Sequence, residues 1–349
     1  MTVKIFLTGA SGYIGGTALD HVYKAHPDYD YTLLVRDEKR GEPIKAKYPT
    51  AKFIYASLEN SDAVRDAAAA ADIVIHTADS SDNVPGASAI SKGIKEGHSP
   101  ENPGYWIHVS GTSILMWYDQ EQKRFGEAPL PEQKYHDIKD IDRLLNLPDQ
   151  AEHRNVDIMV QGSVSDAVKV AIVCPPTIYG RGAGTVTTRS SQVPGMARKT
   201  LKAGYAPIYG HGKTEWDHVH VDDLGELFVK LVDATQDPSK NGNPEIFGER
   251  GYFFANGGTH CWADVAKTVA EEAHKQGYIA KPETRLISED EAVQRGEAAT
   301  TCAKNSKGEG ERAKKYLDWA PMGVPLQDAL AEAVADEAKL LGMKPTTGN

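Results

Sequence analysis

A glycine-rich turn near the start of this 349-residue chain is the first stretch whose residue types and spacing could do chemistry. The letters TGASGYIGG place Gly9, Gly12 and Gly15 in a GxxGxxG pattern between a β-branched run and a helical pattern. Glycine permits a tight strand-to-helix turn and lets backbone amides approach a pyrophosphate, whose charge the helix N-terminus stabilises. This context predicts a dinucleotide site. The turn residues expected to contact the cofactor are Gly9, Ser11, Gly12, Tyr13 and Ile14.

The end of the second β-branched run bears on which dinucleotide binds. An acidic side chain there can accept hydrogen bonds from the adenosine ribose, whereas an arginine can pair with a 2′-phosphate. The run ends in Val35-Arg36-Asp37, and Lys39 and Arg40 follow. Arg36 favours NADP as the cofactor. NAD stays open, because a shift of one residue would place Asp37 on the ribose.

Other reactive side chains lack the spacing that a second chemistry needs. His218 and His220 alternate along a strand-like segment and share one face, but no third metal ligand is evident, so no metal is expected. The three cysteines are far apart without a CxxC pair, and no GxSxG elbow is present. The sequence therefore favours neither a disulfide framework nor a hydrolase.

The elements that would position the turn alternate between short β-branched runs and longer helical stretches. The runs cover residues 3–8, 31–36, 52–57, 72–76, 105–110 and 168–174. This order predicts an α/β fold with a doubly wound, Rossmann-like parallel sheet. Residues 1–180 are expected to form the dinucleotide-binding domain.

Residues 181–349 are expected to form mainly a smaller C-terminal substrate lobe, with some segments returning to the sheet domain. Its helices are predicted at residues 224–231, 263–273 and 326–341, where apolar residues recur at helical spacing. The polar stretch 303–312 is expected to be a solvent loop or a mobile flap.

Charge and hydropathy exclude several classes of protein. A formal charge of −10 repels phosphate backbones and anionic membranes, so neither nucleic acid nor a membrane is an expected partner. The chain has no long apolar run and starts without a targeting pattern, which predicts a soluble, cytoplasmic protein. A small-molecule substrate is expected, and a homodimer stays open.

Motifs along most of the chain resemble the extended short-chain dehydrogenase/reductase superfamily, in its NAD-dependent epimerase/dehydratase-like, fungal-type group. They are TGASGYIG, IHTAD, VSGTS, PPTIYGRG and HVHVDDL, in that order. Their combination is specific to the superfamily and much less so to a reaction, because its members include reductases, epimerases, dehydratases and cofactor-binding regulators. The resemblance implies that Thr112 holds the substrate oxygen. It also implies cofactor contacts at Thr77, Ala78, Pro175, Thr177 and Ile178.

The superfamily's chemistry uses a Tyr-x-x-x-Lys pair on one helix face, where the ammonium lowers the pKa of the phenol for proton exchange. Tyr135 and Lys139 match this spacing and begin a plausible helix. In a rival register, a later helix leads straight into the run at 168–174 and places His153 and Asp157 where tyrosine and lysine would be. Both registers stay open.

The substrate region departs from the nucleotide-sugar enzymes of the superfamily. Trp216 stands where those enzymes carry a phosphate-binding arginine, which argues for a less charged, aromatic or polycyclic substrate. Trp117 could line the same cavity. The alternative is that both indoles belong to the core of the lobe.

Together these features predict an NADP-dependent oxidoreductase that reduces a carbonyl or imine of a small, non-nucleotide substrate. Two alternatives stay open. One is a non-redox isomerase, dehydratase or cyclase of the same fold, and the other is a non-catalytic NADP-binding sensor.

Overall fold

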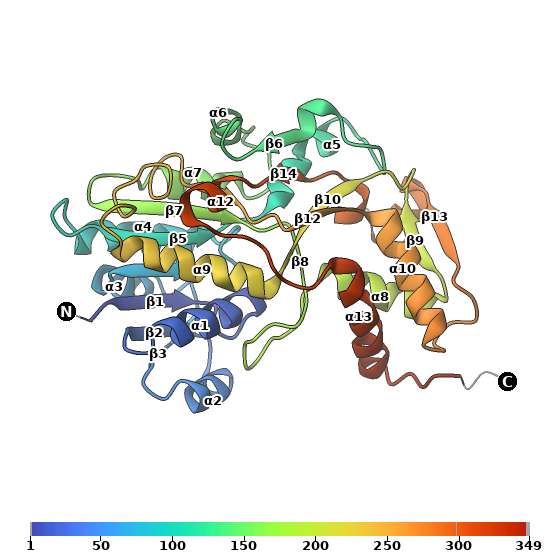
Figure 1. Cartoon of the computed structure of the whole chain (residues 1–349), viewed down its shortest axis with the longest axis horizontal. Helices are drawn as coiled ribbons and strands as arrows, with labels where there is room; N and C mark the ends of the chain where they lie inside the picture. Colours follow the sequence, from blue (N-terminus) through green and yellow to red (C-terminus); the bar gives the residue numbers. More distant parts are fainter. Residues whose placement is uncertain (1, 298, 347–349) are drawn as a thin grey trace.

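Seven runs of β-branched and aromatic residues pair into one parallel sheet in the computed structural model, which describes residues 2–297 and 299–346 (Figure 1). The strand order is β11-β7-β5-β4-β1-β2-β3. The strands are β1 (Lys4–Thr8), β2 (Asp30–Val35), β3 (Lys52–Tyr55), β4 (Ile73–His76), β5 (Gly104–Val109), β7 (Val168–Cys174) and β11 (Tyr252–Phe254). The doubly wound, Rossmann-like fold predicted from the sequence is confirmed.

The order of the strands reverses beside β1. From β1 the chain builds outward to β2 and β3, and it then returns to β4 on the other side of β1. In open α/β sheets a ligand binds at such a reversal, beyond the carboxyl ends of the strands. The glycine-rich turn lies at this point.

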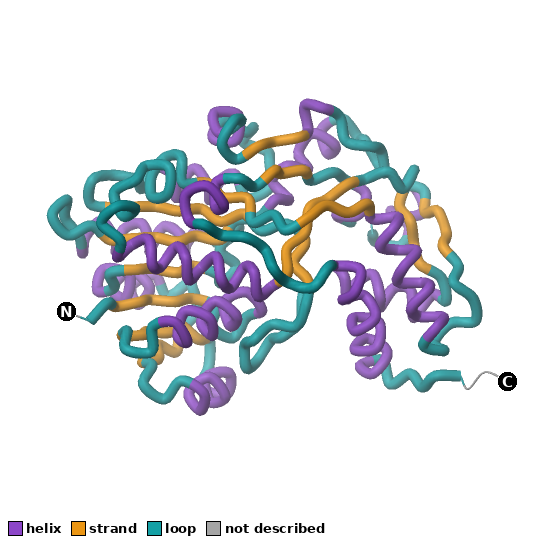
Figure 2. Tube along the Cα trace, viewed as in Figure 1, coloured by secondary structure: helices purple, strands orange, loops and turns teal. Residues whose placement is uncertain are grey.

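Helices cover both faces of the sheet (Figure 2). Side chains alternate along β1, so Ile5 and Leu7 face one apolar cluster while Phe6 faces the other. The first face is covered by α1 (Tyr13–Ala25) and α9 (Val221–Gln236), with α2 (Glu38–Lys47) and α12 (Arg312–Leu317) nearby. The second is covered by α3 (Ser61–Ala70), α4 (Val84–Gly97) and α7 (Arg154–Gln161).

A smaller lobe lies beyond the carboxyl ends of the strands (Figure 1). Three of its helices pack on one another around their own apolar cluster, and they are α8 (Gln192–Ala203), α10 (Trp262–Lys275) and α13 (Leu326–Leu340). Two small sheets accompany them, β8 (Thr177–Tyr179) with β10 (Glu215–His220) and β12 (Gly258–Cys261), and β9 (Ala206–Tyr209) with β13 (Thr284–Ile287). The short helices are α5 (Trp117–Glu121), α6 (Ile141–Leu145) and α11 (Glu289–Gln294), and three 3₁₀ turns cover Thr112–Met116, Pro131–Gln133 and Thr301–Ala303.

The prediction that the helix at residues 224–231 belongs to the second lobe is wrong. It is part of α9, whose Leu224, Phe228 and Leu231 are buried with β1 and α1 in the core of the sheet domain. An amphipathic stripe shows that a helix has a buried face without showing which sheet or lobe buries it.

The polar stretch 303–312 is likewise not a solvent loop or flap. It contains β14 (Lys307–Glu309), which pairs in parallel with β6 (Lys134–His136). Asn305, Ser306 and Arg312 are buried, at most 1% exposed, because their polar groups bind other parts of the chain.

None of the helices in the described ranges combines the length and apolarity that crossing a membrane requires.

Candidate dinucleotide site

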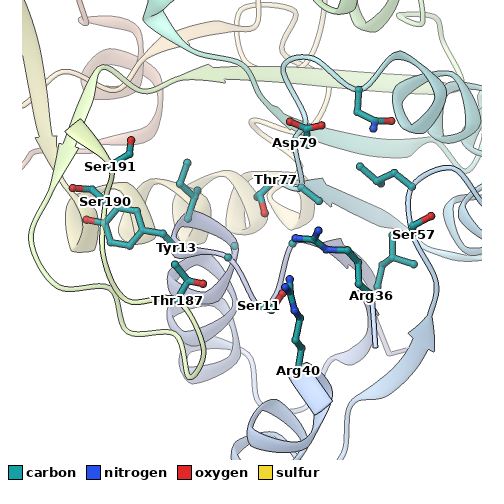
Figure 3. A pocket seen from close by; sticks show the side chains of 18 of the residues that line it. Ser11, Tyr13, Arg36, Arg40, Ser57, Thr77, Asp79, Thr187, Ser190 and Ser191 are labelled. Atoms are coloured by element: carbon teal, nitrogen blue, oxygen red, sulfur yellow. The ribbon is translucent and has the colours of Figure 1, made fainter. Parts of the chain in front are cut away.

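A cavity of about 730 Å³ opens at the carboxyl ends of the central strands, where their order reverses (Figure 3). Its floor is the turn after β1 and the start of α1, and its sides are the segments that follow β2, β3 and β4. A long segment between β8 and α8 closes it from the direction of the lobe. Its volume falls in the range typical of cofactor sites.

The glycine turn brings backbone to the floor of the cavity. Gly9 has a φ of +83°, and a Cβ at this position would come within 2.9 Å of the Ala78 nitrogen. Gly12 precedes the first turn of α1, and no side chain among the described residues caps that helix. The N-terminal amides of a helix have no partners within the helix, so they can hold a pyrophosphate. The residues present therefore fit a dinucleotide.

Two arginines lie on the part of the cavity wall that follows β2. Arg36, directly after β2, and Arg40, in the first turns of α2, both extend towards Ser11 (Figure 3). Asp37 serves a different purpose, because its Oδ1 accepts the Arg40 backbone N–H at 2.9 Å and caps α2. The cavity is thus lined by the two arginines, while the Asp37 carboxylate caps α2 through Oδ1 and lies 3.4 Å from the Arg40 Nε through Oδ2.

The segment over the cavity is tied to the cofactor-binding helix. The Tyr13 hydroxyl donates to the Gly180 carbonyl oxygen at 2.7 Å, and the Ala183 N–H donates to Thr17 Oγ1 at 3.1 Å. Arg189, farther along the segment, lines the cavity and forms an ion pair with the buried Glu337 of α13. The C-terminal helix therefore helps to hold one wall of the site.

The structure places most of the sequence-predicted cofactor residues at the cavity. Those on its wall are Gly9, Ser11, Gly12, Tyr13, Ile14, Arg36, Thr77, Ala78 and Ile178. Pro175 and Thr177 lie behind it: the Pro175 carbonyl oxygen accepts the Thr112 N–H at 3.2 Å, and Thr177 is fully buried, while Pro176 between them lines the cavity.

Tyr135 and Lys139 do not share a helix, contrary to the sequence-based expectation. Tyr135 lies in β6 and is 4% exposed, and its hydroxyl accepts the Trp117 Nε1–H at 3.2 Å. Arg143 covers its ring at 4.4 Å, and Lys139 is exposed outside the helix that begins at Ile141. The side chains of Tyr135 and Lys139 therefore do not lie on one helix face, although their spacing matches Tyr-x-x-x-Lys.

Thr112 lies in the turn after β5 and is buried. Its side chain is 2% exposed and its Oγ1 is buried, without a hydrogen-bond partner in the described chain. Its carbonyl oxygen accepts the Ser306 hydroxyl at 2.6 Å, which fixes it against the segment before β14. The neighbouring Ser113 is only partly buried.

His153 begins α7, the helix that leads into β7, as in the rival register. Its partner, however, is not Asp157. His153 Nδ1 lies 2.7 Å from Asp82 Oδ1 and its Nε2 lies 2.5 Å from Ser113 Oγ. Asp157 is fully buried and accepts the Tyr252 hydroxyl at 2.8 Å, and burial raises its pKa to about 6.

We expect the Asp157→Asn variant to gain stability over the wild type as the pH rises from 5 to 8. A carboxyl whose pKa is higher in the folded state, here about 6, than in the unfolded chain binds its proton on folding. Its contribution to stability is therefore present at low pH and is lost as the pH rises through 6. Asparagine avoids this loss and can still accept from Tyr252, so the difference should grow by about 1–2 kcal/mol.

Urea unfolding of both proteins at the two pH values measures this difference, with the exposed Asp166→Asn as the control. A difference that does not change with pH would show that Asp157 stays ionised in the folded protein throughout this range.

The structure places the two indoles predicted to line the substrate cavity, Trp216 and Trp117, among other side chains of the protein. Trp216 is 3% exposed in the core of the lobe, where its Nε1–H donates to the Lys304 carbonyl oxygen at 2.7 Å and its ring meets Trp262. The expectation that Trp216 lines the substrate cavity is wrong, because an amphipathic indole can satisfy its one donor inside a core. Trp117 is partly buried beside Tyr135.

Several residues at the site were not singled out in the sequence. Glu59, Asn83 and Arg189 line the cavity, and Asp82 and Ser113 bind His153. The position of Asn83 and Asp82 after the fourth strand was the available signal, since residues at strand carboxyl ends meet at one edge. Arg189 had no such signal, because its segment follows no strand of the main sheet.

The parallel sheet, its reversal beside β1 and the glycine-lined cavity together define a dinucleotide-binding protein of the Rossmann type. A family model for NAD(P)H-binding proteins matches residues 9–100, and one for the NAD dependent epimerase/dehydratase family matches residues 150–246. The chain is 34% identical to Oxidase ucsJ of Acremonium sp over 98% of its own length and 100% of that protein.

Solved structures agree with this fold. The dTDP-glucose 4,6-dehydratase DesIV of Streptomyces venezuelae superposes with a TM-score of 0.66 at 15% identity, covering 97% of each chain. The UDP-glucose 4-epimerase of Thermotoga maritima gives 0.64 at 16% identity, covering 97% of this chain and 100% of that one. The chain belongs to the extended short-chain dehydrogenase/reductase superfamily and has an NAD(P)-binding domain.

Proposed function

We propose that this protein is an NADP-dependent oxidoreductase that reduces a carbonyl or imine of a small, non-nucleotide substrate. The observation that carries the choice of cofactor is the pair Arg36 and Arg40 on the cavity wall, with Asp37 engaged as the cap of α2. Guanidinium groups bind a 2′-phosphate through charge-assisted hydrogen bonds, whereas a carboxylate serves the unmodified ribose of NAD. When bound, the dinucleotide would supply the hydride.

Two further observations support redox chemistry on a substrate that is not a nucleotide sugar. The relative from Acremonium is named an oxidase, which is a redox activity, and it aligns over its full length. The resemblance implies a phosphate-binding arginine at position 216 in the nucleotide-sugar enzymes, whereas this chain has Trp216 there, a buried and uncharged indole. A small neutral molecule with a reducible carbon suits this arrangement.

Replacing Arg36 with alanine should weaken NADPH binding about 10- to 100-fold, because a charge-assisted bond to a phosphate contributes roughly 1.5–3 kcal/mol. NADH binding should change little, since it lacks that phosphate. Calorimetric titration of the purified, cofactor-stripped wild type and variant with both dinucleotides measures the effect.

Lys39→Ala is the matched control, because Lys39 is an exposed cation three residues further along the chain, in α2, and lies outside the wall of this cavity. Tighter binding of NADH than of NADPH by the wild type would contradict the proposed cofactor. A screen of small carbonyls and imines for NADPH consumption tests the reaction, and binding of NADPH without turnover of any of them would contradict a reductase.

A further inference from the structure

Three side chains from three separate loops form one hydrogen-bonded chain beside the cofactor cavity. Asp82 belongs to the segment between β4 and α4, Ser113 to the 3₁₀ turn after β5, and His153 to the start of α7. His153 lies between the other two, with Nδ1 at 2.7 Å from Asp82 Oδ1 and Nε2 at 2.5 Å from Ser113 Oγ. The sequence separations of 71 and 40 residues mean that only the fold brings them together.

The three hydrogen-bonded side chains lie at the edge of the sheet where the cavity opens. Asp79 and Asn83, which flank Asp82 in sequence, both line the cavity. The imidazole rests against the turn after β5, since a Cβ on Gly111 would come within 3.3 Å of His153 Nε2. Ser113 thus lies on the side of the site where the segments after β4 and β5 converge.

The backbone of His153 is strained in a way that fixes the ring. Its φ of +66° lies in the left-handed region, which is unfavourable for a residue with a Cβ. The conformation is held because the Val156 and Asp157 N–H groups both donate to the His153 carbonyl oxygen, at 3.1 and 3.0 Å. Strain that the surroundings maintain is typical of functional positions.

The direction of donation in these two hydrogen bonds follows from the groups at their ends. A carboxylate only accepts, so the contact between Asp82 and His153 requires a proton on Nδ1. Nε2 then accepts from Ser113 when the ring is neutral and donates to Ser113 when the ring is charged. The Asp82 side chain is 59% exposed and that of His153 is 13% exposed, so solvent can restore a proton to this end of the chain.

We propose that Ser113, His153 and Asp82 form the proton relay of this enzyme, an inference that rests on the proposed reductase function. The Ser113 O–H bond breaks as its proton passes to the substrate oxygen or nitrogen, whose carbon is reduced by the hydride of NADPH. Ser113 Oγ takes the replacement proton from the His153 imidazolium at Nε2. The neutral imidazole keeps its proton on Nδ1 and donates it in a hydrogen bond to Asp82, and a proton from the solvent then recharges the ring at Nε2.

In this relay Ser113 is the catalytic residue, because it touches the substrate. His153 supplies its proton, and Asp82 is a positioning residue that fixes the tautomer and orientation of the ring. A carboxylate on Nδ1 plays this part in the Ser-His-Asp triad, where the imidazole exchanges protons with a hydroxyl through Nε2.

The test compares full-length wild type with Asp82→Ala, Ser113→Ala and His153→Gln. Glu152→Gln is the matched control, because Glu152 neighbours His153 but binds Gln120 at 2.7 Å and could do so equally well as an amide. With a carbonyl substrate from the screen, Ser113→Ala and His153→Gln should each lower kcat by about 100-fold or more, while the Kd for NADPH stays unchanged. Asp82→Ala should lower kcat by about 10- to 100-fold.

A second readout needs neither cofactor nor turnover. In protein with isotope-labelled histidine, the Cδ2 chemical shift of His153 reports its tautomer in the neutral ring, and loss of the signal in His153→Gln assigns it. We expect the Nδ1–H tautomer in wild type, Ser113→Ala and Glu152→Gln, and a shift towards the Nε2–H tautomer in Asp82→Ala. The Nε2–H tautomer in the wild type would overturn the relay.

Failure of the relay and failure of the proposed function look different. A wild type that binds NADPH and reduces a carbonyl, with variants that retain full kcat, would overturn the relay alone. A wild type that binds NADPH but consumes none with any carbonyl or imine would overturn the proposed function, and with it the redox role of these residues.

Discussion

Replacing Gly15 with alanine is expected to weaken NADPH binding by about 5- to 150-fold, since overpacking a tight site costs roughly 1–3 kcal/mol. Gly15 lies in the first turn of α1, where a methyl group would collide with the Gly9 carbonyl oxygen and the Thr77 hydroxyl. That hydroxyl donates to the Thr8 carbonyl oxygen at 2.7 Å and holds the segments after β1 and β4 together. The methyl group would therefore push the floor of the cavity apart where the pyrophosphate should lie.

The matched control is Gly195→Ala in α8, where an added Cβ meets no heavy atom of the described chain within 4 Å. This variant should bind NADPH like the wild type, and alanine should favour its helix. Calorimetric titration of both variants, with circular dichroism to verify their fold, separates local collision from unfolding. Wild-type affinity in a folded Gly15→Ala protein would mean that the dinucleotide does not bind over this turn.

Local patterns were sufficient to predict the sheet and the floor of the site. The strand runs and the glycine turn are adjacent in sequence, and the steric needs of a strand-to-helix turn act within a few residues. Arg36 follows its strand directly, so its place on the cavity wall could be expected as well. The positions of the glycine turn and of Arg36 depend on neighbouring residues alone, so they could be predicted from the sequence.

Tyr135 and Lys139 show where local spacing misleads. Four residues apart, they would share a helix face, but the segment instead pairs as β6 with β14. Its partners Lys307 and Glu309 lie more than a hundred residues away. The polar residues of that stretch are typical of a loop. Tertiary pairing overrode the local helical pattern, which is the ordinary limit of propensity arguments.

Polar pairs across loops could not be predicted for a related reason. Asp82 and Ser113 meet because they follow β4 and β5, parallel neighbours that end at one edge, and His153 joins them because α7 begins at that edge and leads back to the start of β7. Asp157, one turn from His153 in sequence, turns inward to Tyr252 instead. Helical spacing identifies which residues share a face, whereas the partner of each side chain depends on the neighbouring elements.

The largest expected effect on stability comes from Arg312, whose side chain is fully buried. Its guanidinium donates to the Asp137 carbonyl oxygen at 2.7 and 3.2 Å, to the Glu245 carbonyl oxygen at 2.9 Å and to Glu245 Oε2 at 2.8 Å. The Asp137 carboxylate in turn accepts the N–H groups of Glu311, Arg312 and Phe254, which join the β14 segment to β11. One cation thus connects three segments that are distant in sequence.

We expect Arg312→Met to lower the free energy of unfolding by about 2–4 kcal/mol, because the carbonyl oxygens of Asp137 and Glu245 lose their donor, whereas the Glu245 carboxylate is 27% exposed and can turn to water. Methionine nearly fills the volume but leaves two carbonyl oxygens and the Glu245 carboxylate without their donor. Burial already raises the pKa of Asp137 to about 6 against the opposing effect of Arg312, so loss of the cation removes one of the groups that favour its charged form.

Urea unfolding of Arg312→Met measures this cost, with Lys314→Met as the control on the exposed face of the same helix. The control should change stability by less than about 0.5 kcal/mol, as surface substitutions usually do. The contacts of Arg312 join the residues after β6 and before β11 to the β14 segment, and this segment also holds Thr112 through Ser306. Loss of this cation should therefore loosen the chain behind Ser113 as well, and equal stability of the two variants would mean that apolar packing alone holds these segments together.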